Sequence, residues 1–280
     1  MTRAVIKSVL DFVLYSSIVL SICAAGLTFS TYLILDLIPG FETILLCTIA
    51  FSGTFLIYNI PVWLQEEECQ EFYGIISFRA IKIIFGILSL LLIFCASLLP
   101  SKVLLFLLHV LIIALIYVLT GLRSVRFLNV RKVPFLKIFL LTYAWGATTV
   151  FMPVLWHNLN IFSSGVLMLF FERFLIILAL AIPFDIRDRQ SDEEAGILTI
   201  PVILGTERAK DVSLVILTIL IVVTVIHYGA GPVLSSRLIT ISLAVAAISY
   251  VHEGLSKKYY LIFIDGIMLV QVAVLWWLMF

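Results

Sequence analysis

Charged side chains are scarce in this 280-residue chain, because Asp, Glu, Lys and Arg together make up 12% of it while 63% of the residues are hydrophobic. Soluble domains contain about 25% charged and about 45–50% apolar residues, so this chain has too little polar surface to cover a soluble globule. The composition excludes a soluble enzyme, a secreted disulfide module, a coiled coil and a disordered scaffold. A net charge of +1 indicates no bulk attraction to nucleic acid, and we expect no nucleic-acid partner.

Cysteine is also scarce, and its spacing is uninformative. The four cysteines, Cys23, Cys47, Cys69 and Cys95, form no C-x-x-C pair, so they predict neither a disulfide framework nor a metal site. The alternation of polar and apolar residues that is typical of transmembrane barrel strands is missing as well, because the apolar runs are continuous.

Long apolar runs dominate what is present. Each is close to the roughly 20 apolar residues that a bilayer-spanning helix needs. The nine runs lie at approximately 9–35, 43–64, 81–99, 103–122, 136–155, 161–184, 212–229, 233–251 and 259–280. No linker is long enough to separate two domains. The sequence therefore predicts an all-α membrane protein, one domain over residues 1–280 with nine transmembrane helices.

Basic residues indicate how these helices are oriented, since they prefer cytoplasmic loops. A cytoplasmic N-terminus places every Lys and Arg on the cytoplasmic side except Lys102, Arg173 and Arg237. We therefore expect a cytoplasmic N-terminus and a multi-pass protein of a bacterial inner (plasma) membrane, with its functional site on the cytoplasmic side.

Acidic residues gather in two of the predicted cytoplasmic stretches, 65–82 and 185–211. In the second stretch, Asp185, Asp188 and Asp192 are separated by three and four residues, a spacing that predicts three carboxylates on one helical face. Like charges so placed repel, and Mg²⁺ relieves this by binding one or two carboxylates together with substrate phosphate oxygens. The spacing predicts a Mg²⁺-diphosphate site at the membrane surface. The first stretch, with Glu66, Glu67, Glu68 and Glu71, fits solvated loop charges equally well.

Basic residues of the same loops are candidates for holding the phosphate oxygens. Each of them is also explained by membrane topology alone. The candidates are Arg126, Arg131, Lys132, Lys137 and Arg187.

Residues 183–205 read PFDIRDRQSDEEAGILTIPVILG. The pattern D-x-x-D-x-x-x-D followed by Gly, Thr, Pro and Gly closely resembles the second aspartate motif of the UbiA superfamily of intramembrane prenyltransferases. Residues 131–134, before the fifth predicted helix, look like the basic loop of that family. The resemblance implies nine helices around a central cavity, Mg²⁺ as cofactor, and a polyprenyl diphosphate whose prenyl group passes to a hydrophobic acceptor. A quinone precursor, haem, a chlorophyll-like ring and glycerol phosphate all remain open as acceptors.

The first motif of that family, N-D-x-x-D-x-x-x-D, is altered in this chain. Asn59 matches, Ile60 and Trp63 replace aspartates, and Glu67 supplies the final carboxylate. Pro61 is expected to break or kink the helix there. The resemblance implies Asp185, Asp188 and Asp192 as catalytic residues and, with Glu67, as metal ligands. It implies as substrate-binding residues Asn59, Glu67, Arg126, Arg131, Lys132 and Arg187.

Two functions remain open after this departure. The first is Mg²⁺-dependent prenyl transfer, in which aromatic faces such as Tyr58, Trp63, Tyr143 and Trp145 could stabilise a carbocation. The alternative is a non-catalytic membrane protein that binds an isoprenoid or another lipid.

Some charged residues fall inside predicted helices, where charge is expensive and often functional. Glu172 and Arg173 are adjacent and should point in different directions, while Asp265 is isolated and should face the bundle interior. The sequence assigns none of them a catalytic role.

Overall fold

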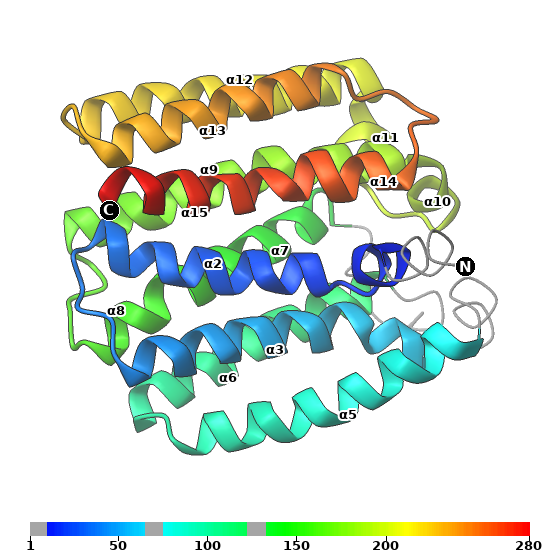
Figure 1. Cartoon of the computed structure of the whole chain (residues 1–280). Coiled ribbons are helices and arrows are strands. Elements are labelled where there is room, and N and C mark those ends of the chain that lie inside the picture. The colour runs from blue at the N-terminus through cyan, green and yellow to red at the C-terminus, as the bar shows by residue number, and fades with distance from the viewer. Residues whose placement is uncertain (1–9, 65–74, 122–132) are drawn as a thin grey trace, which may run out of the picture.

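The computed structural model describes residues 10–64, 75–121 and 133–280, and these residues form helices and short connections with no strand. The helices run side by side along one direction, so that their ends define two opposite faces of the bundle (Figure 1). The predicted all-α architecture is confirmed for the part of the chain that is described.

Seven helices run through the bundle without interruption. They are α2 (Ile18–Ile34), α3 (Phe41–Leu64), α5 (Ile75–Ser97), α6 (Ser101–Gly121), α9 (Ser164–Arg187), α12 (Thr206–His227) and α13 (Pro232–Ser249).

Two further crossings are each interrupted by one π-helical turn. The first consists of α7 (Leu136–Gly146), η2 (Ala147–Phe151) and α8 (Met152–Trp156), and the second of α14 (Lys257–Tyr259), η3 (Tyr260–Ile264) and α15 (Asp265–Met279). Two short helices, α10 (Arg189–Glu194) and α11 (Ile200–Leu204), lie at one end of the bundle beside α14 (Figure 1).

Eight of the described helical segments are long and apolar enough to cross a bilayer, while α2, with 17 residues, is apolar but shorter. The count of nine crossings and the cytoplasmic N-terminus therefore stay predictions. The hydrophilic stretches are partly helical, because α5 begins at Ile75 and α12 at Thr206. Pro61 does not end α3, which continues to Leu64.

Neighbouring helices close a ring. Along the ring α2 packs on α3, α3 on α6, α6 on α7, α7 on α9, α9 on α12, α12 on α13, α13 on α15, and α15 on α2. Helix α5 packs outside this ring against α3. Glycine permits the closest approaches, since a Cβ at Gly146 would lie 2.9 Å from the Phe170 ring. The ring arrangement leaves an interior that side chains from several helices can share.

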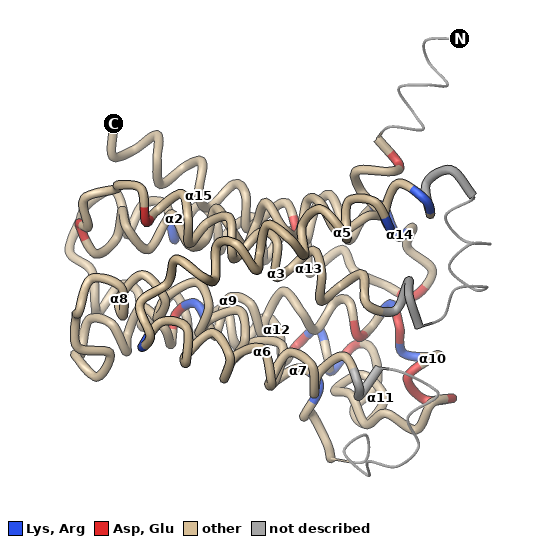
Figure 2. The backbone as a smooth tube through the Cα atoms, turned by 90° about the horizontal axis from the view of Figure 1, so that it is seen from below, with Lys and Arg blue, Asp and Glu red and all other residues tan. Residues whose placement is uncertain are grey.

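Charged residues gather mainly at the end of the bundle that carries α10, α11 and α14 (Figure 2). The chain ends at Phe280 at the opposite end (Figure 1). The bundle therefore has one strongly charged end, built largely from the second acidic stretch.

Three buried charges lie away from that end. As predicted, Glu172 and Arg173 point to different partners. Arg173 donates to the Leu27 carbonyl oxygen at 3.0 Å and to the Ser30 hydroxyl at 2.8 Å, both on α2. The Glu172 carboxylate lies 3.6 Å from the Arg237 guanidinium on α13, and both side chains are almost fully buried. Helix α9 is thus tied to α2 on one side and to α13 on the other.

The pair between Glu172 and Arg237 gives a test of this packing. Arg237→Met should lower the free energy of unfolding by about 3–5 kcal/mol, because it leaves a buried carboxylate without its counter-charge. The double variant with Glu172→Gln should recover most of that loss, since no buried charge is then stranded. Denaturant unfolding in detergent measures both. Equal destabilisation by the single and the double variant would contradict the pairing.

Candidate functional site

A cavity of about 380 Å³ opens at the charged end of the bundle. Its polar lining includes residues of α3, α6, α7, α9 and the α14–α15 crossing, which are far apart in the sequence. The polar residues that matter most are Tyr58, Lys137, Asp185, Arg187, Asp188 and Asp265. The cavity lies where the second aspartate motif predicts a site.

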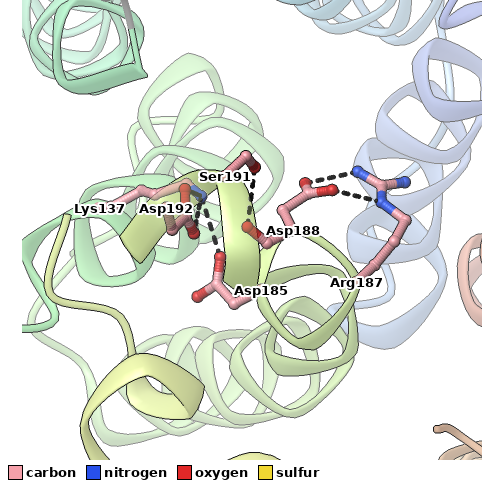
Figure 3. Close-up of polar contacts among 6 residues, drawn as sticks. All are labelled: Lys137, Asp185, Arg187, Asp188, Ser191 and Asp192. Carbon is pink, nitrogen blue, oxygen red and sulfur yellow. Dashed lines mark hydrogen bonds and ion pairs between the residues drawn. The ribbon is translucent and has the colours of Figure 1, made fainter. Parts of the chain in front are cut away.

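The three aspartates of that motif do not share one helical face. Helix α9 ends at Arg187, Asp188 has φ −94° and ψ 7°, and α10 begins at the next residue. Because the helix is interrupted at Asp188, Asp185 and Asp192 turn toward Lys137 while Asp188 turns toward Arg187 (Figure 3). The expectation of a single face is wrong because the three-and-four spacing spans two helices.

Lys137 joins two of these carboxylates. Its Nζ lies 3.1 Å from Asp185 Oδ1, and 3.3 Å and 3.1 Å from the two oxygens of Asp192. The two carboxylates are nearly buried, with 7% and 8% of their side chains exposed. The ammonium offsets a repulsion that would otherwise act between two buried like charges.

Local backbone geometry holds Lys137 in this position. Phe135, just before α7, has φ 63°, and its N–H donates to the Leu198 carbonyl oxygen at 3.0 Å. The segment that precedes α7 is thereby fixed to the segment that follows α10. Gly196 closes α10 with φ 71°, a conformation that glycine adopts without strain, and the Ile197 N–H donates to the Asp192 carbonyl oxygen at 2.8 Å. Gly196 of the motif thus helps to position Asp192.

Arg187 and Asp188 form the second ion pair of the site. The guanidinium donates two parallel hydrogen bonds to the Asp188 carboxylate, each of 2.7 Å. It also lies 5.1 Å from the centre of the Phe184 ring and 5.6 Å from that of Tyr260. The fork geometry and the aromatic contacts keep a rigid, permanently charged group beside the cavity.

The carboxylates that share Lys137 fit one Mg²⁺ ion. Mg²⁺ is usually held by one or two carboxylates and completes its shell with water and phosphate oxygens. Asp185 Oδ2 is buried and accepts no hydrogen bond, so one oxygen is available to a cation. Burial raises the pKa of the Asp192 carboxyl above its ordinary value, although the Lys137 ammonium opposes the shift. Within the described ranges, no three His, Cys, Asp or Glu side chains are grouped to hold a metal, so substrate oxygens would have to complete the shell.

A second cavity of about 320 Å³ adjoins the first and is almost wholly apolar. Tyr58, Tyr117, Leu141 and Trp145 line both cavities and therefore mark their junction. The apolar cavity extends between α3, α5, α6 and α7, where Gly53 is one of its lining residues. The site therefore combines a charged chamber at the bundle end with an apolar chamber inside the bundle.

Several other residues predicted for the site do not line these cavities or lie outside the described residues. Asn59 is buried, and its amide donates to the carbonyl oxygens of Phe55 and Ser16 instead of lining the charged cavity. Tyr143 lines neither cavity, and its hydroxyl lies 3.0 Å from His109 Nε2. Outside the described residues lie Glu67, Arg126, Arg131 and Lys132, together with the side chain of Trp63.

Asp265 is a polar lining residue to which the sequence analysis assigned no role. It faces the bundle interior, as predicted, and is 4% exposed. The signal that could have identified it was its isolation, since an ionisable residue within a membrane helix is by default a candidate for function.

Comparisons with known proteins agree with this fold. A model of the UbiA prenyltransferase family matches residues 72–263. The fold is similar to the apo structure of a UbiA homolog from Aeropyrum pernix K1, with a TM-score of 0.69 and 17% identity over 94% of this chain and 99% of that chain. It is also similar to a structure of digeranylgeranylglyceryl phosphate synthase, with a TM-score of 0.58 and 15% identity over 96% of this chain and 97% of that one. A search of curated proteins finds no match.

Lys137→Gln tests the central ion pairs. The variant should unfold at a lower temperature than wild type at pH 7, because two buried carboxylates lose their cation. Burial raises the pKa of the Asp192 carboxyl in the folded state. The folded protein therefore keeps a proton on this group at a pH where the unfolded chain has lost it, and this contribution to the free energy of unfolding falls as pH rises. The deficit should therefore shrink as pH is lowered, and added Mg²⁺ should stabilise the variant more than wild type.

Lys210→Gln is the matched control, since Lys210 pairs with the exposed Glu207 and such surface pairs contribute little. The measurement is the unfolding temperature of wild type, Lys137→Gln and Lys210→Gln across a range of pH. A Lys137→Gln deficit that is the same at every pH would contradict the carboxylate explanation.

Proposed function

The chain belongs to the UbiA prenyltransferase family, and on that basis we propose that it transfers a polyprenyl group from a polyprenyl diphosphate to a hydrophobic acceptor. The observation that carries the proposal is the pair of adjoining cavities, one charged and one apolar. A polyprenyl diphosphate has the same division into an anionic head and a long apolar tail. We propose that the charged chamber faces the cytoplasm of a bacterial inner membrane.

The charged chamber suits the diphosphate. Lys137 and Arg187 line it and offer hydrogen bonds from permanently charged donors. The remaining head-group residues proposed from the resemblance are Asn59, Glu67, Arg126, Arg131 and Lys132. As the diphosphate leaves, negative charge grows on its oxygens, and fixed cations stabilise that charge where it develops.

Mg²⁺, held by Asp185 and Asp192 with Asp188 nearby, would add positive charge beside the leaving group. The chain's own contribution there is to keep these carboxylates in place through Lys137 and Arg187 until the donor binds. Both cations can then turn from carboxylate to phosphate oxygens.

The junction between the cavities suits the reacting carbon. With the head in the charged chamber and the tail in the apolar one, the allylic carbon lies near Tyr58, Tyr117 and Trp145. Aromatic faces attract a cation, most strongly where water is excluded. The apolar surroundings also limit premature capture of the cation by water.

Release of radiolabelled diphosphate from several polyprenyl diphosphates by the purified protein tests the proposal. We expect Mg²⁺-dependent release together with a prenylated product when an acceptor is added. A protein that binds the donor but releases nothing would instead support the non-catalytic alternative, which the altered first motif motivates.

Asp188→Asn and Asp192→Asn should each weaken Mg²⁺-dependent donor binding, because each removes a carboxylate charge from the head-group site. The apo proteins should keep their helices. Glu207→Gln makes the same chemical change on the exposed surface and should bind the donor as wild type does. Binding of farnesyl thiodiphosphate, a donor analogue that ionises poorly, measures the effect with and without Mg²⁺. Unchanged binding in both aspartate variants would argue against their role.

Gly53→Leu tests the apolar chamber. Gly53 lines the cavity and a Cβ there meets no atom within 4 Å, so a larger side chain can begin at this position and should reduce the space for the tail. The variant should lose activity with a C20 donor by at least about 10-fold relative to a C10 donor, a loss of about 1.4 kcal/mol. Gly86→Leu is the control, because Gly86 has equal room but does not line the cavity. An equal loss of activity with the C20 and the C10 donor would show that the donor tail does not occupy the apolar cavity.

A further inference from the structure

Buried polar side chains form a layer across the bundle, far from the charged cavity. Arg173 of α9 donates to the Leu27 carbonyl oxygen of α2 at 3.0 Å, and the neighbouring Glu172 lies 3.6 Å from Arg237 of α13. Glu172 and Asp185 are 13 residues apart on α9, so the layer lies about 20 Å from the aspartates of the charged cavity. These charged side chains line neither of the two cavities described above.

A fourth helix, α15, also contributes to this layer. Ser236, the residue before Arg237, donates from its hydroxyl to the Gln271 carbonyl oxygen at 3.2 Å. The Gln271 side chain is buried, so an amide lies at the level of the buried charges. The polar layer therefore consists of Glu172, Arg173, Arg237 and Gln271, and it lies where α2, α9, α13 and α15 meet.

The polar layer carries one positive charge in excess, because it combines two guanidinium groups with one carboxylate. All three charged side chains are at most 3% exposed. Glu172 is the acidic residue that acts on Arg173, and it also interacts with Arg237, Tyr228 and His227. The carbonyl and hydroxyl oxygens to which Arg173 donates are dipoles, so they solvate its charge without cancelling it. Charge at membrane depth is expensive, and a monovalent anion would neutralise the layer.

Several nitrogen donors of the polar layer have no acceptor. Nε and Nη2 of Arg237, Nε of Arg173 and Nε2 of Gln271 are buried and make no hydrogen bond with a described residue. In Arg237 these two nitrogens form the edge of the guanidinium that donates two parallel hydrogen bonds, the same edge with which Arg187 holds its aspartate. The Glu172 oxygen that pairs with Nη2 lies beyond hydrogen-bond distance, at 3.6 Å. The geometry therefore suits a ligand that accepts hydrogen bonds from this edge.

Water and anions are the two ligands to compare. Water would serve these donors and also the Glu172 oxygens, which accept no hydrogen bond. Water cancels no charge, however, so the excess positive charge favours an anion. A divalent anion would overcompensate that charge, and a large organic anion does not suit side chains that are almost completely buried. Chloride has both the charge and the small size that the layer requires.

We propose that the polar layer binds one chloride ion, held by the Nε–Nη2 edge of Arg237 with Arg173 and Gln271 as further donors. The anion neutralises the layer and links α9, α13 and α15 inside the membrane. Its consequence is a bundle whose stability depends on chloride. The site is independent of the proposed prenyl transfer, because it lies far from the charged cavity and its ligand is not a substrate.

The test follows thermal unfolding of the full chain in nanodiscs in sodium chloride, sodium bromide and sodium gluconate at equal ionic strength. The unfolding temperature of wild type should rise with chloride or bromide and then level off, because the anion binds the folded state. The expected rise is about 5 °C at about 100 times the dissociation constant. Gluconate carries the same charge but is too large for the layer, so it should give no such rise. A non-specific salt effect would be equal in all three salts.

Two variants change the charge of the polar layer in opposite directions. Arg237→Gln removes the excess charge together with the binding edge, so it should abolish the chloride-dependent rise. Glu172→Gln removes a like charge beside the anion and should lower the chloride concentration that gives half of the rise by at least about 10-fold. Arg208→Gln is the matched control, because it makes the first change on the exposed surface of α12 and should respond to chloride as wild type does.

Crystals of wild type grown in bromide locate the anion directly, since bromide scatters anomalously. We expect an anomalous peak within hydrogen-bond distance of Arg237 Nε and Nη2. The inference is overturned by equal unfolding temperatures in chloride and gluconate, by a full chloride response in Arg237→Gln, by an unchanged half-point in Glu172→Gln, or by crystals with no peak at Arg237. If Arg237→Gln fails to fold, the Glu172→Gln titration and the bromide position decide the question.

Discussion

The contact of Lys137 with Asp185 and Asp192 is the interaction on which the charged end of this bundle depends. It joins the first turn of α7 to the end of α9 and to α10. Without the ammonium, two nearly buried carboxylates would face each other at the wall of the cavity. Positive-φ residues and a hydrogen bond between the two loops hold the surrounding backbone in the position that this contact requires.

In the proposed function, the same contact would let the site respond to a ligand. Carboxylates held by a flexible lysine side chain can exchange this partner for a divalent cation, while the lysine turns to the phosphate that arrives with it. Arg187 and Asp188 form a second pair of the same kind. The apo site is thus stabilised by its own cations, and the proposed donor would redistribute these pairs without leaving buried charge unpaired.

Much of this arrangement could be predicted from the sequence, because apolar run length and the aspartate motif are local signals. The helices follow from run length, and a charged cavity does lie beside the aspartate motif. The interruption at Asp188 could not be predicted, because a three-and-four spacing is the same on one helix or on two. Nor could the convergence of Lys137 on two aspartates, since it depends on a hydrogen bond between loops about 60 residues apart, from Phe135 to Leu198. Asn59 matched its motif position yet turned to backbone carbonyls, because a motif fixes residue identity and not side-chain direction.

The most direct test is a structure of the protein in nanodiscs with farnesyl thiodiphosphate and Mg²⁺. We expect the diphosphate to lie within hydrogen-bond distance of Lys137 and Arg187, with the farnesyl chain between α3, α5 and α6. A farnesyl chain on the outer surface of the bundle, or a head group near Glu172 and Arg237, would contradict the proposed binding mode.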